Sequence, residues 1–237
     1  MTNPLGLIID CLIGTIILGG SLSLGTSLAL IRTDEGIAIA TDSRAVDEYG
    51  NKRPDACKII EVGKDLYYSL AGMTQGNGFN IRTTIERRIK VSDVRRGTLS
   101  VKEALTHVFA TRLNDPQVVD FDKQNRSIVT VLLFGMDGTV PTVGFVKLSL
   151  RSGLLSTETH VCPSDCIDGR KAYSTTPSMD FDLLSRTAPP LDAVRRFVRM
   201  EISKDIPDIG GPIQILTISR DGQRTWIAKP AICKDQD

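Results

Sequence analysis

The order of apolar segments along this 237-residue chain is the feature that most limits how it can fold. Residues 27–32 and 36–41 are mainly apolar and flank a Thr-Asp-Glu-Gly turn, a pattern that predicts a β-hairpin. Residues 57–62 and 66–71 predict a second pair of strands, joined through Gly-Lys-Asp. The first strongly patterned part of the chain is therefore expected to form antiparallel strands.

The pattern changes to a helical one after these strands. Residues 76–91 carry apolar side chains at near-helical spacing. A second helix is predicted from Ser100 to about Asn114, because Glu103 follows Ser100 by three residues and completes a capping box. The side chains expected to be buried are Phe79, Ile81, Ile85 and Ile89 in the first helix and Ala104, Val108 and Leu113 in the second.

Strands and helices alternate again in the second half. Strands are predicted at residues 127–135, 139–150, 212–219 and 224–228, and helices at residues 178–185 and 190–203. This order suits an α+β fold with two sheets between two layers of helices.

Four residues of the first half stand at regular intervals. Thr26, Asp42, Lys58 and Gly72 are separated by 16, 16 and 14 positions, in the local sequences Gly-Thr-Ser, Thr-Asp-Ser-Arg-Ala, Cys-Lys-Ile-Ile and Leu-Ala-Gly. Each has an ordinary structural explanation when taken alone, as a turn, a local ion pair or an edge-strand lysine. Their joint spacing is a far more specific signal.

This spacing resembles that of the proteasome β-subunit family of N-terminal nucleophile hydrolases. The resemblance implies a four-layer αββα sandwich over residues 26–237, preceded by a leader of residues 1–25. It also implies a threonine-type endopeptidase that works inside a ring or open stack of like subunits. No cofactor or metal is expected.

The four residues have a coherent chemistry as a peptidase site. The Thr26 hydroxyl needs a base, and the α-amine of Thr26 can serve once the Gly25–Thr26 bond is cut. Lys58, kept cationic by Asp42, would lower the pKa of the hydroxyl and of the amine. The backbone N–H of Gly72 would stabilise the oxyanion.

The resemblance also implies a pocket for the residue before the cleaved bond. The matching positions are Ala45, Ala56, Ile60, Leu70 and Thr74. None is charged, and an unpaired charge is costly to bury. We therefore expect cleavage after medium or large apolar residues such as Leu, with little cleavage after Asp or Arg.

The chain departs from the family near Gly210 and Gly211. The family has an Asp and a Ser before this Gly-Gly pair, whereas here Ile209 replaces the Ser and neither Asp205 nor Asp208 falls at the expected step. The Gly-Gly-Pro-Ile sequence looks more like the bacterial proteasome relatives (Anbu and the betaproteobacterial homologue). Ser164 and Ser174 are candidates for the family's other serine.

Residues 1–25 leave three interpretations open. No charged residue occurs between Cys11 and Ile31, and Gly25 suits self-cleavage of a propeptide. Ser23 and Gly25 also fit the cleavage site of a signal peptide, which would export the protein. A membrane anchor is disfavoured because a spanning helix needs about 20 residues. A propeptide in a cytoplasmic protein is the favoured interpretation, and membrane association is expected only if the leader is retained.

Composition excludes some partners and leaves one alternative function. The net charge of +1 gives no reason to expect binding to nucleic acid. The expected partners are unfolded polypeptide, other copies of the chain and a possible unfoldase. The five cysteines have no zinc-site spacing, and Cys162 and Cys166 are expected to be free loop thiols. The alternative function is a catalytically silent, proteasome-like ring subunit.

Overall fold

The computed structural model describes most of the chain after residue 25. The described residues are 26–46, 51–53, 56–63, 65–76, 78–89, 93–123, 126–166, 170–175, 178–231 and 233. The predictions for residues 1–25 lie outside them.

The first of two five-stranded sheets is antiparallel and holds the N-terminal hairpin at its centre. Its strand order is β12-β1-β2-β13-β14. The strands are β1 (Leu28–Thr33), β2 (Gly36–Thr41), β12 (Lys171–Ser174), β13 (Gln214–Ser219) and β14 (Arg224–Ala228). The hairpin β1–β2 is thus flanked by strands from the far end of the chain.

The second five-stranded sheet is also antiparallel and has the order β11-β10-β9-β6-β5. Its strands are β5 (Ile60–Gly63), β6 (Leu66–Gly72), β9 (Ser127–Asp137), β10 (Val140–Arg151) and β11 (Leu154–Cys162). Two short ribbons, β3 (Ala45–Val46) with β4 (Lys52–Arg53) and β7 (Gln75–Gly76) with β8 (Phe79–Asn80), extend from one end of the sheets.

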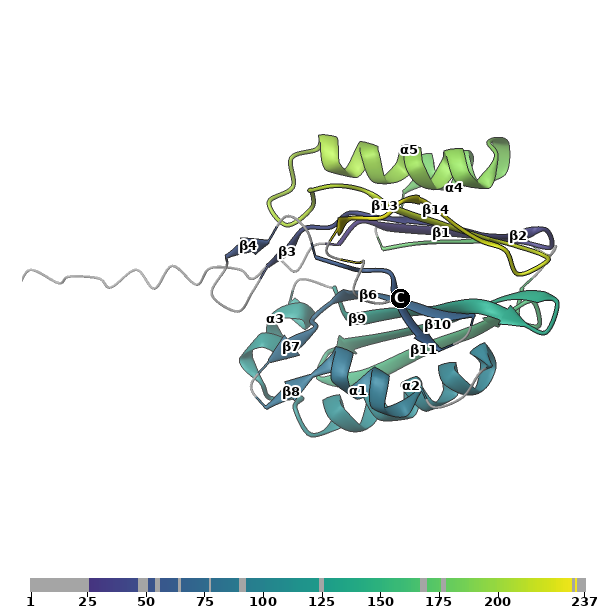
Figure 1. The fold of residues 1–237 in the computed structure, drawn as a ribbon. Helices are drawn as coiled ribbons and strands as arrows, with labels where there is room; N and C mark the ends of the chain where they lie inside the picture. The colour runs from purple at the N-terminus through teal and green to yellow at the C-terminus, as the bar shows by residue number, and fades with distance from the viewer. Residues whose placement is uncertain are drawn as a thin grey trace, which may run out of the picture.

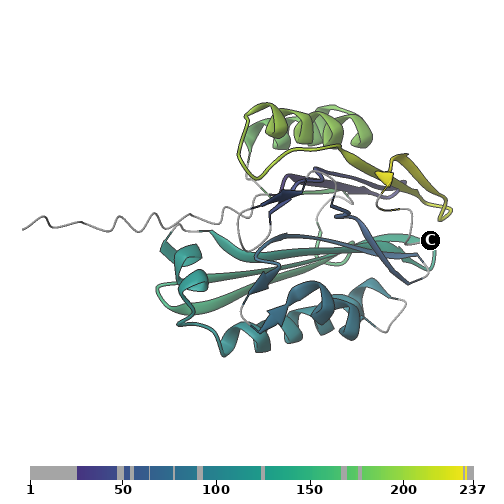
Figure 2. The ribbon, with the colours of Figure 1, turned by 60° about the vertical axis from the view of Figure 1, so that its left-hand side comes forward.

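Helices cover the outer face of each sheet. The helices α4 (Met179–Thr187) and α5 (Pro190–Ser203) lie over the first sheet, and α1 (Ile81–Arg88) and α2 (Val94–Ala110) lie over the second (Figures 1 and 2). Helix α3 (Pro116–Lys123) contacts β9 and β10. The described residues therefore form a mixed α/β structure of stacked helices and antiparallel sheets.

Each sheet is covered by helices on one face and by the other sheet on its second face, so its central strands carry apolar side chains on both faces. Along β9, Val129, Val131 and Leu133 face the helices of their own side, whereas Leu132 and Phe134 pack in the core between the sheets. This alternation gives a strand that is buried almost throughout. The same division holds in β1, where Leu28 and Leu30 face the other sheet while Ala29 and Ile31 face α5.

The predicted strands agree with the structure better than the first predicted helices. The strands expected at 36–41 and 224–228 and the helix at 190–203 have the predicted bounds. The strand expected from residue 57 begins only at Ile60.

The helix expected over residues 76–91 is wrong in its first part. Residues 75–80 contain the ribbon β7–β8, and α1 begins at Ile81 after an N-cap by Asn80, whose side chain accepts a hydrogen bond from the Thr83 N–H. The four-residue spacing of Ile81 and Ile85 is helical, but Phe79 belongs to a strand.

The helix expected to start at Ser100 begins earlier, at Val94, with Asp93 as its N-cap. The sequence Arg-Arg-Gly-Thr resembles a loop, but Gly97 and Thr98 are buried in α2. A Cβ at Gly144 of β10 would meet the Thr98 side chain, so this glycine allows the helix to pack closely on the sheet. Long-range packing therefore sets this helix start.

Besides the short strands of the two ribbons, the sequence did not predict α3, β11 or β12. Strand β11 is at the edge of its sheet and its first residues alternate between exposed and half-buried, so it lacks an apolar run. The expected free thiols at Cys162 and Cys166 are also wrong, because the two residues are joined as a disulfide. None of the helices within the described residues is both long and apolar enough to cross a membrane.

Candidate active site

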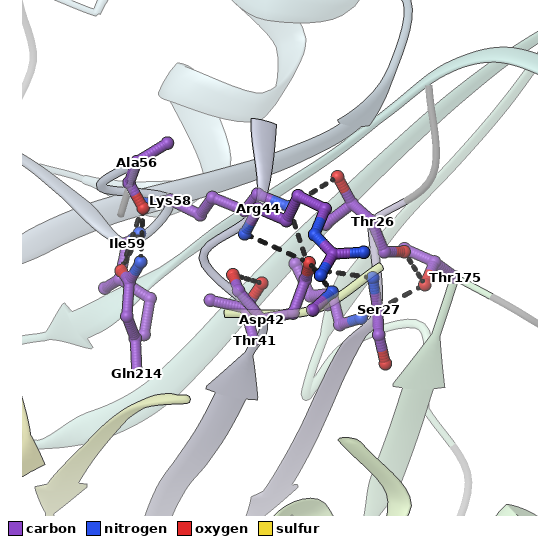
Figure 3. A network of polar contacts seen from close by, with 12 residues as sticks. Thr26, Ser27, Thr41, Asp42, Arg44, Ala56, Lys58, Ile59, Thr175 and Gln214 are labelled. Atoms are coloured by element: carbon purple, nitrogen blue, oxygen red, sulfur yellow. Dashed lines mark hydrogen bonds and ion pairs between the residues drawn. The ribbon is translucent and has the colours of Figure 1, made fainter. Parts of the chain in front are cut away.

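Three of the predicted catalytic residues meet in one polar cluster, which we call the Thr26 cluster (Thr26, Asp42 and Lys58). The Lys58 Nζ donates to Thr26 Oγ1 at 3.1 Å and to Asp42 Oδ1 at 2.7 Å (Figure 3). The Asp42 side chain is fully buried, and that of Lys58 is 9% exposed. The ammonium thus bridges a carboxylate and the threonine hydroxyl.

The hairpin β1–β2 explains why Thr26 and Asp42 are neighbours. Leu28 is paired with Thr41 at the open end of the hairpin. One residue further on, the Asp42 N–H donates to the Ser27 carbonyl at 3.0 Å, and the Ser27 N–H donates to Asp42 Oδ1 at 3.0 Å. The hairpin register therefore fixes the separation of 16 residues between Thr26 and Asp42.

The second oxygen of Asp42 connects the cluster to the Gly210 loop. Asp42 Oδ2 accepts from the Gly210 N–H at 3.0 Å and from the Arg44 N–H at 3.2 Å. Gly210 has a φ of +154°, and a Cβ there would lie 2.5 Å from an Arg44 guanidinium nitrogen. A glycine is required at this position, so the first residue of the Gly210–Gly211 pair is explained by backbone structure alone.

Lys58 is held by a residue of the opposite sheet. Gln214, on β13, accepts from the Lys58 N–H at 3.0 Å and from the Ile59 N–H at 3.2 Å, and its amide donates to the Ala56 carbonyl at 2.6 Å. Cys57 is joined to Cys233 by a disulfide, with the Cα atoms 5.4 Å apart. The segment that carries Lys58 is thus fixed on both sides.

Thr175 is the hydroxyl residue that contacts Thr26, and the sequence did not identify it. Its Oγ1 donates to the Thr26 carbonyl at 2.7 Å and accepts from the Leu28 N–H at 3.1 Å. Of the two serine candidates, Ser174 pairs with Ala29 in the sheet and Ser164 bonds to the Val161 carbonyl. Thr175 directly follows Ser174, at the end of β12.

The two aspartates before Gly210 differ sharply in environment. Asp205 is exposed, with a φ of +50° in a turn after α5. Asp208 is 5% exposed, its Oδ2 has no hydrogen-bond partner among the described residues, and its charge raises the pKa of Lys58. Asp208 is therefore the one of the pair that acts on the cluster.

Burial dominates the electrostatics of the cluster. Loss of solvation raises the pKa of Asp42 above its ordinary value, against the opposing effect of Lys58. The pKa of Lys58 is lowered from 10.5, first by burial and further by Arg44, although Asp42 raises it. The lysine thus releases a proton more readily than a lysine in water.

A cavity of about 350 Å³ opens beside the cluster. Its lining includes Thr26, Lys58, Gly72 and all five predicted pocket residues, Ala45, Ala56, Ile60, Leu70 and Thr74. Arg44, Arg53 and Arg82 also line it, at positions outside those that the family resemblance implies for the pocket.

Gly72 lies in the same cavity wall and has a structural requirement of its own. Its φ is +96°, and a Cβ would lie 2.5 Å from the Ile128 carbonyl oxygen. A glycine is thus needed at this position for the end of β6 to lie close to β9, whether or not its N–H donates to an oxyanion. The role of this N–H as an oxyanion donor stays a prediction.

Comparison with protein-family models and with curated proteins does not place this chain in a family. No protein-family model matches it, and no curated protein matches it significantly. Within the described residues, no group of three or more His, Cys, Asp and Glu side chains is arranged to hold a metal ion. Function must therefore be argued from the site itself.

Proposed function

We propose that the protein is a threonine-type endopeptidase with Thr26 as its nucleophile, built as a proteasome-like αββα sandwich of the N-terminal nucleophile class. The observation that carries this proposal is the Lys58 ammonium, which is bonded to both the Thr26 hydroxyl and the buried Asp42 carboxylate. A threonine hydroxyl in a simple structural role has no need of a buried cation. The adjoining cavity offers room for a substrate side chain.

The reaction begins with hydrolysis of the Gly25–Thr26 bond, which consumes one water and frees the Thr26 α-amine. This amine has an ordinary pKa of about 7.7–8.0 and can accept a proton near neutral pH. As Thr26 Oγ1 bonds to the carbonyl carbon of a peptide, its proton passes to the amine. Lys58 stabilises the negative charge that develops on Oγ1, and the Gly72 N–H stabilises the carbonyl oxygen.

The tetrahedral intermediate then collapses to an ester. The peptide C–N bond breaks, and the leaving nitrogen takes the proton from the α-ammonium. Water next attacks the ester carbon and gives a proton to the amine, which returns it to Oγ1 as the second product leaves. Thr175, which holds the Thr26 carbonyl, fixes the backbone from which the amine and the hydroxyl extend.

The first test is the N-terminal residue of the active protein. Intact mass should show a chain that begins at Thr26. Thr26→Ala should abolish self-processing and peptide hydrolysis, and Lys58→Ala should lower hydrolysis by about 10⁴-fold or more, the scale seen when one member of a catalytic unit is removed. Lys123→Ala, at a side chain 72% exposed, is the control and should leave both unchanged.

An active preparation that retains Met1 would contradict the mechanism. Circular dichroism should show that the variants keep their secondary structure, so that a loss of rate is not a loss of fold. The pocket is tested with a fluorogenic peptide panel, in which faster cleavage after Arg or Asp than after Leu would contradict the apolar pocket.

A catalytically silent ring subunit is the alternative, and Ile209 favours it. The residue that replaces the family's serine is apolar and 5% exposed, so its side chain gives no hydroxyl to the site. In this alternative the Gly25–Thr26 bond stays intact and the protein assembles without hydrolysing peptides. Intact mass together with a peptide-hydrolysis assay distinguishes the two functions, because both assemble.

We also propose that the protein assembles with copies of itself in the cytoplasm, takes unfolded polypeptide and works with an unfoldase partner. Enclosure in an assembly would restrict a non-specific peptidase to chains that can enter. A monomer at micromolar concentration in light scattering would contradict the assembly.

A further inference from the structure

The lining of the cavity is positively charged. Four of its residues are cationic: Arg44, Arg53, Lys58 and Arg82. Among the described residues that line it, none is Asp or Glu. A chain with a net charge of only +1 thus gathers four of its cations around one cavity.

Two of these cations already bind other groups of the protein. Lys58 is bonded to Asp42 and Thr26. The guanidinium of Arg44 donates to the Pro207 carbonyl at 3.0 Å and lies against Gly210. Lys58 holds the Thr26 cluster together, and Arg44 lies against the loop that contains Gly210.

The other two stand at the solvent end, which we call the cavity mouth (Arg53, Gln75, Asn80 and Arg82). All four of these residues are exposed, and they come from β4, β7, β8 and the start of α1. The side chain of Arg82 is 46% exposed, and its Nε donates to Glu86 Oε1 at 2.8 Å. This bond fixes the direction of the guanidinium, although Glu86 also offsets part of its charge.

The deeper walls of the cavity are apolar by contrast. Ile60 is 5% exposed, and Leu70, Ala45 and Ala56 are half-buried. An acidic side chain inside this part would lose its hydration next to apolar walls. A carboxylate at the mouth would stay hydrated and still lie close to two guanidinium groups, whose attraction a cleft lined by one sign of charge strengthens.

We propose that this site selects acidic peptides, in which Asp or Glu residues flank the apolar residue that enters the pocket and bind Arg53 and Arg82 at the cavity mouth. This inference rests on the proposed peptidase function and names its substrate class. It assigns the two arginines as specificity-determining residues and leaves the chemistry at Thr26 unchanged.

The test is a set of fluorogenic peptides that share Leu before the cleaved bond and differ only in the second and third residues before it. Those two residues are Glu, Gln or Lys. We expect kcat/KM to fall in the order Glu, Gln, Lys, with about five-fold between Glu and Gln for each carboxylate–arginine pair, as for a well-placed exposed ion pair. The Glu advantage should shrink as salt is raised, because the Debye length falls from about 10 Å at 0.1 M to about 3 Å at 1 M.

Three variants test whether Arg53 and Arg82 cause the preference for Glu peptides. Arg53→Gln and Arg82→Gln should each reduce the Glu advantage, and the double variant should remove most of it. Arg87→Gln is the matched control, since Arg87 is exposed on the same helix as Arg82 and does not line the cavity. It should keep the full advantage. Equal rates for the three peptides in the unaltered protein would overturn the inference while leaving the peptidase function intact.

Binding to the Thr26→Ala protein separates this inference from the proposed function. If no peptide is hydrolysed, the peptidase function fails, but fluorescence anisotropy still compares the Kd values of the labelled Glu and Lys peptides. Tighter binding of the Glu peptide, lost in Arg53→Gln, supports the acidic site. Equal Kd values contradict it.

Discussion

The Thr26 cluster and the cavity mouth lie at the two ends of one cavity and are built in opposite ways. Asp42 accepts four hydrogen bonds, from Ser27, Lys58, Arg44 and Gly210, and is fully buried. The mouth consists of exposed side chains on two ribbons and on the first turn of α1.

The two regions differ because the Thr26 cluster would carry out catalysis and the cavity mouth would select the substrate. Groups that must hold a proton in place are fixed by backbone donors from several segments, so that one change leaves several partners unsatisfied. Groups that attract a substrate stay hydrated and act through weak, additive ion pairs. Changes in the cluster should therefore be nearly all-or-none, and changes around the cavity should be graded.

Asp42→Asn should show the largest effect. Asparagine keeps the size of the side chain but offers one acceptor oxygen for donors that now use two. Lys58 also loses its buried counter-ion, a change that typically costs about 3–5 kcal/mol. We expect peptide hydrolysis to be lost and the free energy of unfolding to fall by about that amount, measured by urea denaturation.

Asp182→Asn on the exposed side of α4 is the control and should change neither quantity. If Asp42→Asn kept its activity and its stability, the cluster would be no more sensitive than the mouth. The contrast between the two regions would then be wrong.

Part of the Thr26 cluster follows from local structure. The register of one hairpin sets Thr26 against Asp42, and apolar alternation reveals that hairpin without any tertiary knowledge. Lys58 is less local, since Gln214 holds it from 156 residues away. The recognition of Lys58 came from the family spacing and not from the pattern of its own segment.

The residues that the sequence missed depend on contacts between distant segments. Thr175 reaches Thr26 only because β12 pairs with β1, and β12 is too short to give a sequence signal. Arg53 and Arg82 line the same cavity because β4 and the start of α1 both border it, and neither arginine was identified from the sequence as part of a site. Contacts between segments that are distant in the sequence leave no periodic pattern in the sequence.

The alkaline limit of activity should also report on the cluster. The mechanism needs the Lys58 ammonium, whose pKa is lowered from 10.5 chiefly by burial. As pH rises through this lowered pKa, the proton is lost and kcat/KM should fall, by about ten-fold for each further pH unit. The falling limb should therefore lie below pH 10.5, in a rate profile of the processed protein. A limb at or above 10.5 in protein that is still folded by circular dichroism would mean that Lys58 is not the group required.

Ala56→Leu should give the smallest of these effects, because it changes the cavity without touching the cluster. The backbone of Ala56 is held on both sides, by the Ser43 carbonyl at 2.8 Å and by the Gln214 amide at 2.6 Å, so the larger side chain must enter the cavity that it lines. Loss of that space should lower kcat/KM for a peptide with Leu before the cleaved bond by about ten-fold, within the range for small changes of volume in an apolar pocket. Peptides with Ala at that position should be affected much less. Ala110→Leu, an exposed position at the end of α2, is the control and should change neither rate. An equal fall for the Leu and Ala peptides would mean that the substitution acts through the neighbouring Lys58, and that the pocket cannot be altered separately from the Thr26 cluster.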